Sequence, residues 1–129
     1  MCIRDSLKIL RDVVGRGTAT AIKVQGYAVA GKTGTAQMVV GGAYVPGAYT
    51  SSFIGIVPAD RPQYVILIKV DRPRGEYYGS IVAGPAFADL AGRVLWREGV
   101  LPKKLSTAID DPDAPAALAP AARGDGLRH

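Results

Sequence analysis

Two runs of β-branched and aromatic residues, separated by a short segment bounded by prolines, most constrain how this chain folds. Residues 52–57 (Ser-Phe-Ile-Gly-Ile-Val) and 63–70 (Gln-Tyr-Val-Ile-Leu-Ile-Lys-Val) have the composition of strands. The segment from Pro58 to Pro62 between them has the composition of a turn. Together they predict an antiparallel hairpin, which needs helices or further strands to cover its apolar side chains.

Helical spacing on both sides of this hairpin predicts that cover. Apolar residues recur at helical intervals across residues 5–14, and Gly15 follows as a stop signal. From Gly79 the period is again helical up to Gly99, with Pro85 in a first-turn position, which predicts one amphipathic helix. Residues 27–37 have strand composition, whereas residues 41–48 are too irregular for a regular element. The predicted fold class is α+β, with antiparallel strands and flanking helices.

The two ends of the chain differ from the rest. Residues 1–6 look like an arbitrary cut or an assembly artefact, so we treat them as a boundary. Residues 102–129 are rich in Ala, Pro and Asp and offer little to bury, so we expect a disordered tail. The folded part is therefore predicted to span residues 7–101.

Charge and composition exclude several kinds of function. The formal net charge is +5, but Lys and Arg are scattered and form no five-residue basic block, so we expect no nucleic-acid partner. One cysteine, Cys2, and one histidine, the terminal His129, cannot assemble a Cys/His metal site. We expect neither a metal nor a cofactor. An apolar run of about 18 residues or more is also missing, so the sequence predicts no membrane span.

Residues 29–37 (Val-Ala-Gly-Lys-Thr-Gly-Thr-Ala-Gln) carry the clearest functional signal. They place an ammonium, two hydroxyls and a glycine on one short extended segment, a set suited to holding a carboxylate beside a reacting carbonyl. Lys-Thr-Gly is one of three motifs of penicillin-binding proteins and serine β-lactamases. The other two are absent, because no serine has a lysine three positions later and the chain has no asparagine. We therefore interpret the chain as the C-terminal part of a larger enzyme. The nucleophilic serine of that enzyme is missing from this part.

A second motif competes for the same residues. Residues 26–33 satisfy the phosphate-binding pattern Gly-x-x-x-x-Gly-Lys-Thr, and residues 65–71 resemble the strand and aspartate that hold magnesium in nucleotide-binding proteins. A phosphate loop, however, requires a helix that starts at the Lys-Thr pair. The intervening Tyr-Ala-Val-Ala prefers extended structure, and the residues after Thr33 are poor helix formers. We favour a strand that runs through Lys32.

The match to the penicillin-binding family extends beyond Lys-Thr-Gly. Residues 17–19 (Gly-Thr-Ala), 29–37, 52–58 and 77–87 (Tyr-Tyr-Gly-Ser-Ile-Val-Ala-Gly-Pro-Ala-Phe) together resemble the end of a class B penicillin-binding protein transpeptidase domain, most closely of the cell-division (septal) type. The resemblance implies a partial penicillin-binding protein/serine β-lactamase-like fold. It also implies a serine D,D-transpeptidase that cross-links peptidoglycan stem peptides ending in D-Ala-D-Ala and is inhibited by β-lactams.

The resemblance also assigns roles to four residues. Lys32 supplies positive charge near the substrate carboxylate and helps proton transfer at the serine, and the hydroxyls of Thr33 and Thr35 bond that carboxylate. Gly34 leaves room for the substrate backbone, and the backbone N–H of Thr35 is an oxyanion-hole donor. Lys32 and Thr35 are thus the expected catalytic residues, and Thr33, Gly34 and Thr35 the expected substrate-binding residues.

Location, partners and alternatives follow from the same resemblance. It places the parent protein in the bacterial inner membrane with this domain on the periplasmic side, beside other division or cell-wall synthesis proteins. A D,D-carboxypeptidase or a serine β-lactamase on the same fold remains an alternative, as does a non-catalytic β-lactam-binding sensor or scaffold. For this chain alone we expect no activity.

Overall fold

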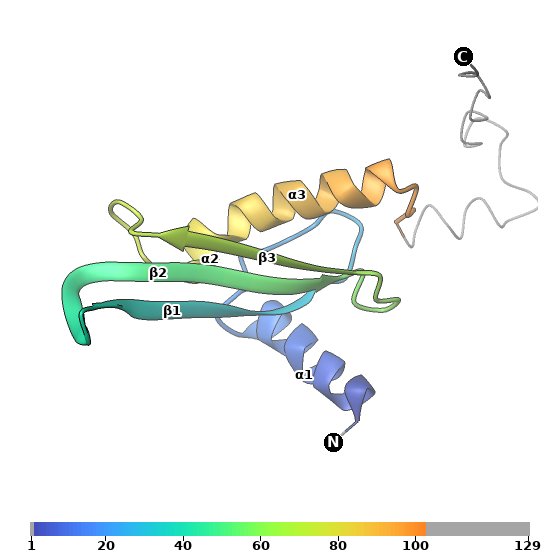
Figure 1. The fold of residues 1–129 in the computed structure, drawn as a ribbon. Coiled ribbons are helices and arrows are strands. Elements are labelled where there is room, and N and C mark those ends of the chain that lie inside the picture. The colour runs from blue at the N-terminus through green and yellow to red at the C-terminus, as the bar shows by residue number, and fades with distance from the viewer. Residues whose placement is uncertain (1, 103–129) are drawn as a thin grey trace, which may run out of the picture.

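The computed structural model describes residues 2–102 and has the predicted α+β composition (Figure 1). In chain order its elements are α1 (Ile3–Arg16), β1 (Ala30–Val40), β2 (Ala43–Val57), β3 (Tyr64–Asp71), α2 (Gly79–Val82) and α3 (Gly84–Arg97). The predicted disordered tail lies outside the described residues from position 103 onward. Among residues 2–102, no helix is long and apolar enough to cross a membrane.

The three strands form an antiparallel sheet in the order β1-β2-β3. The predicted hairpin is confirmed: β2 pairs with β3, and Phe53 lies opposite Ile68. On its other side β2 pairs with β1, which sets Lys32 opposite Ile54 and Thr35 opposite Ser51. Since β1 is an outer strand of this sheet, one of its edges has no neighbouring strand within the described residues.

The prediction that residues 41–48 form no regular element is wrong. Gly41 and Gly42 both have positive φ, +60° and +81°, and join Val40 to Ala43 in a two-residue hairpin turn that favours glycine at both positions. Strand β2 therefore begins at Ala43. The irregularity that we read from the sequence lies inside the strand, because the β1–β2 register shifts between Gln37 and Val39 and leaves residues 45–48 unpaired.

The first helix is confirmed and extends two residues beyond the predicted range at each end. The single C-terminal helix was predicted wrongly, because it is divided at Ala83 into α2 and α3. Pro85 explains the break: it has no N–H to donate to the carbonyl of Ile81, and its ring would clash with that carbonyl in a continuous helix. It lies instead in the first turn of α3, the position predicted for it.

The core lies between α3 and one face of the sheet (Figure 1). Phe53 of β2 and Phe87 of α3 are fully buried, and their rings meet edge to face with centroids 4.7 Å apart. The other face of the sheet is uncovered in the described residues, where Ile54, Val65 and Leu67 are exposed. This alternation along β2 and β3 gives the two sheet faces different surroundings.

Candidate active site

Strand β1 runs through the Lys-Thr-Gly motif. Lys32, Thr33, Gly34 and Thr35 all lie within β1 and pair in register with β2. No helix begins at Lys32, so the local structure that a phosphate loop requires is absent from these residues. The nucleotide-binding alternative is therefore wrong for this motif.

The Lys32 side chain is exposed on the edge strand. Its Nζ donates a hydrogen bond to the backbone carbonyl of Thr33 at 2.8 Å and lies 3.5 Å from Thr33 Oγ1. Within residues 2–102, Lys32 takes part in no ion pair. The ammonium is thus held beside the motif by neutral oxygens, and its charge is available to an anionic ligand.

The two threonine hydroxyls lie on the other face of β1 from Lys32, because side chains alternate along a strand. Thr33 Oγ1 lies 3.2 Å from Thr18 Oγ1, where either oxygen is able to donate. Thr35 Oγ1 accepts a hydrogen bond from the backbone N–H of Gly79 at 3.4 Å. Each hydroxyl is therefore contacted by a residue distant in the sequence.

Gly34 pairs in register with Ser52, so it does not mark a bulge. A β-carbon at Gly34 would lie 2.6 Å from Ser52 Oγ, which is itself 3.5 Å from the carbonyl oxygen of Gly34. Any side chain here would have to displace Ser52. The contact with Ser52 is therefore one reason why position 34 requires glycine, in addition to the space that we expect a substrate to need.

The segment that precedes α2 lies against the Lys-Thr-Gly strand. The Tyr77 ring stacks on Tyr49 of β2 with centroids 4.3 Å apart, and Tyr78 follows at 4.7 Å. The hydrogen bond that the Tyr77 hydroxyl donates to the Tyr78 hydroxyl raises the pKa of Tyr77 above its ordinary value. Only the family resemblance included residues 77–79, and it did not predict their approach to Thr35.

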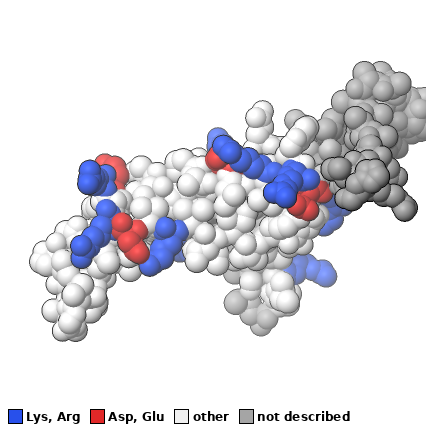
Figure 2. All heavy atoms as spheres, turned by 45° about the horizontal axis from the view of Figure 1, so that its top comes forward, with Lys and Arg blue, Asp and Glu red and all other residues white. Residues whose placement is uncertain are grey.

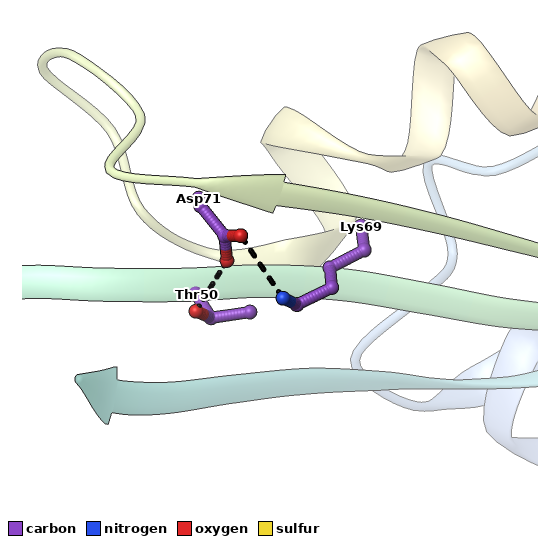
Figure 3. A network of polar contacts seen from close by, with 3 residues as sticks. All are labelled: Thr50, Lys69 and Asp71. Carbon is purple, nitrogen blue, oxygen red and sulfur yellow. Dashed lines mark hydrogen bonds and ion pairs between the residues drawn. The ribbon is translucent and has the colours of Figure 1, made fainter. Parts of the chain in front are cut away.

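A polar cluster on the sheet involves the aspartate of the competing motif (Figure 3). The Asp71 carboxylate accepts hydrogen bonds from Thr50 Oγ1 at 2.6 Å and from Lys69 Nζ at 2.9 Å. These bonds, that of Thr50 first, lower the pKa of Asp71. Asp71 therefore has a local surface role here, and the described residues contain no cluster of three or more metal-binding side chains.

Two cavities lie away from the Lys-Thr-Gly motif. One of 460 Å³ is lined by α1 and residues 20–29, and one of 650 Å³ lies between residues 23–27 and α3. Neither includes Lys32 or Thr35. Charged side chains of both signs are interspersed on the molecular face that Figure 2 shows. The chemistry of the Lys-Thr-Gly strand therefore marks the candidate site.

Comparison with known proteins explains why the described residues form only one side of a site. The sequence model of the penicillin binding protein transpeptidase domain matches residues 3–92. The chain belongs to this transpeptidase family. Similar proteins include the probable peptidoglycan D,D-transpeptidase PenA of Neisseria gonorrhoeae, 41% identical over 93 residues, and the stage V sporulation protein D of Bacillus subtilis, 43% identical over 96 residues.

Solved transpeptidase structures share the fold. The apo transpeptidase domain of Burkholderia pseudomallei penicillin-binding protein 3 superposes with a TM-score of 0.68 at 37% identity over 78% of this chain. Apo penicillin-binding protein 3 of Mycobacterium tuberculosis gives a TM-score of 0.64 at 39% identity over 75% of the chain. The predicted partial penicillin-binding protein fold is confirmed.

The matches cover only part of each relative. They include 71% of this chain but 16% of the gonococcal protein, and 74% of this chain but 15% of the Bacillus protein. The chain corresponds to 31% of the Burkholderia domain and 24% of the mycobacterial structure. This member of the transpeptidase family thus corresponds to one part of a larger domain.

Proposed function

We propose that the protein containing this chain is a serine-type peptidoglycan D,D-transpeptidase of the cell-division type. The observation that carries the proposal is an outer strand that presents Lys32 and two threonine hydroxyls beside an edge with no neighbouring strand among residues 2–102. An extended peptide is able to add to such an edge through backbone hydrogen bonds. The similarity to proteins named probable peptidoglycan D,D-transpeptidases supports the same reaction.

In this proposal the peptide carboxylate lies among Lys32, Thr33 and Thr35. Lys32 contributes a charge from one face of β1, and the hydroxyls donate from the other face to a ligand at the edge. Gly34 leaves the strand surface clear where the ligand backbone passes.

The reaction itself is acyl transfer. A serine oxygen, supplied from outside this chain, attacks the penultimate D-Ala carbonyl, and the terminal D-Ala leaves with a proton on its amine. The amine of a second stem peptide then attacks the acyl-enzyme and releases the serine. The backbone N–H of Thr35 is proposed as one donor to the oxyanion, where one such donor is worth roughly 2.7–4 kcal/mol in the transition state.

The wider assignments are proposals of the same kind. Residues 7–101 form the C-terminal part of the transpeptidase domain, and the parent protein is anchored in the inner membrane with this domain on its periplasmic side. Its ligands are stem peptides and, as inhibitors, β-lactams. Other division or cell-wall synthesis proteins are its partners.

Labelling of the whole protein with a fluorescent penicillin tests the proposal. We expect a covalent adduct on the whole protein and none on the isolated 129-residue chain, which has no Ser-x-x-Lys. An unlabelled whole protein without Ser-x-x-Lys and Ser-x-Asn motifs would instead indicate a sensor or scaffold. Incubation of the unlabelled whole protein with a D-Ala-D-Ala peptide and an acceptor amine separates the reactions: cross-linked product indicates a transpeptidase, and hydrolysed peptide alone indicates a carboxypeptidase.

A further inference from the structure

A series of contacts that begins at Ser51 and runs through residues 77–79 holds the Thr35 hydroxyl in place. Ser51 lies opposite Thr35 in the β1–β2 ladder and is fully buried. Its hydroxyl donates to the backbone carbonyl of Tyr77, and two residues later the N–H of Gly79 donates to Thr35 Oγ1. We propose that Ser51 and Gly79 are positioning residues that orient the Thr35 hydroxyl toward a ligand at the strand edge.

Gly79 is suited to this task because only glycine fits its place over the sheet. A β-carbon at Gly79 would lie 2.3 Å from the carbonyl oxygen of Ser52 and 2.9 Å from that of Gly34. A side chain would therefore lift residues 77–79 from the sheet and lengthen the contact from the Gly79 N–H to Thr35. The buried Ser51 hydroxyl holds the same segment down from its other end.

The direction of the hydrogen bond between the Gly79 N–H and Thr35 Oγ1 determines whether the Thr35 hydroxyl donates to a ligand or accepts from it. A hydroxyl has one proton and two acceptor lone pairs. The Gly79 N–H occupies one lone pair of Thr35 Oγ1, so the hydroxyl proton must point elsewhere. Thr35 thus becomes a donor. Thr33 Oγ1 also accepts a hydrogen bond, from Lys32 Nζ at 3.5 Å, while its contact with Thr18 Oγ1 has no fixed direction.

A donor of fixed direction discriminates between ligand termini. A carboxylate accepts from Thr35 and gains a charge-assisted hydrogen bond, whereas an ester has a weaker acceptor and no charge. The inference rests on the proposed function, because it assumes that Thr35 meets the ligand carboxylate. It adds that Ser51, which has no contact with ligand in this scheme, controls the preference for a free carboxylate.

A double-mutant cycle in the whole protein tests the proposal. The variants are Ser51→Ala, Thr35→Val and the double variant, and the measurement is the acylation rate constant with benzylpenicillin and with its methyl ester. We expect Thr35→Val to slow acylation by the free acid at least about tenfold relative to the ester. Ser51→Ala should produce part of that selective loss, and the double variant should match Thr35→Val alone.

Two further variants serve as controls. Ser51→Cys keeps a weak donor on a slightly larger side chain, so it should lose less selectivity than Ser51→Ala if the donated hydrogen bond matters. Thr50→Val removes a hydroxyl from the same strand that bonds Asp71, and it should leave the selectivity unchanged. Equal slowing of both ligands by the Ser51 variants, or additive losses in the double variant, would overturn the positioning role. An unselective Thr35→Val would show that the assumed carboxylate contact fails, and the positioning role with it.

Discussion

The ring of Phe87 lies against the backbone of Gly55, so that a β-carbon on Gly55 would come within 2.3 Å of Phe87 Cζ. This contact joins α3 to the central strand of the sheet. Gly55 in turn pairs with Gly31, one residue before Lys32. The packing of α3 therefore fixes the strand that supports the Lys-Thr-Gly motif.

Gly55→Ala should destabilise the fold, because the added methyl group must displace the rings of Phe87 and Phe53. We expect a loss of about 1–3 kcal/mol in the free energy of unfolding. Denaturant unfolding of the whole transpeptidase domain measures it. Gly92→Ala is the matched control: a β-carbon at this position of α3 meets nothing within 4 Å, so alanine should stabilise the helix by about 0.5–1 kcal/mol. Equal effects of the two substitutions would contradict the packing argument.

Lys32→Ala should slow acylation of the whole protein by penicillin by about two orders of magnitude, because a charge at the carboxylate and assistance to proton transfer are both lost. Stopped-flow or gel-based labelling gives the rate constant. Lys69→Ala is the control, since Lys69 lies on the same sheet but pairs with Asp71. Unchanged acylation by Lys32→Ala would remove the role assigned to this residue.

Tyr27→Phe should weaken the attachment of the segment after α3. The Tyr27 hydroxyl donates to the carbonyl of the buried Val100, and burial raises the pKa of Tyr27. Loss of one such bond costs about 0.5–1.5 kcal/mol of unfolding free energy. Thermal denaturation of the whole domain measures the change, with the exposed Tyr44→Phe as a control that should have no effect.

Asp71 should titrate below the ordinary aspartate value of about 3.9. Its pKa is lowered in the folded state, so its contribution to stability is present above the unfolded-state pKa and is lost as pH falls through the folded-state pKa. Carboxyl carbon NMR of a selectively labelled domain measures this titration. Thr50→Val removes the first cause of the shift and should raise the pKa of Asp71. A titration unchanged by Thr50→Val would show that the hydroxyl does not act on the carboxylate.

Local patterns predicted much of the fold. The β-branched and aromatic runs of residues 52–57 and 63–70, with the proline-bounded turn between them, correctly predicted the β2–β3 hairpin. Helical spacing alone did not reveal the break at Ala83, because the apolar period continues across Pro85. The Gly41-Gly42 turn was missed because Pro46 and Gly47, which lie in the unpaired part of β2, made the whole segment look irregular.

The candidate site was predictable only where its chemistry is contiguous. Lys32 and Thr35 are close in sequence, so the predicted extended segment was enough to place both on one strand, although their side chains lie on opposite faces of it. Ser51 reaches Thr35 through the strand register, and Gly79 through a backbone N–H that no residue type reveals. Such contacts depend on the tertiary fold and leave no spacing to read.

The shift in register between Gln37 and Val39 has a consequence for how the hairpin tip varies. Because residues 45–48 of β2 already have no partners in β1, an insertion or deletion there changes the size of this bulge and leaves the partners of Lys32 and Thr35 as they are. An insertion or deletion of one residue between this register shift and the Lys-Thr-Gly motif would instead turn the side chains of the motif to the opposite face of the sheet. Length variation among natural homologues is therefore expected to concentrate at the tip, and grafted peptides or tags should be tolerated there.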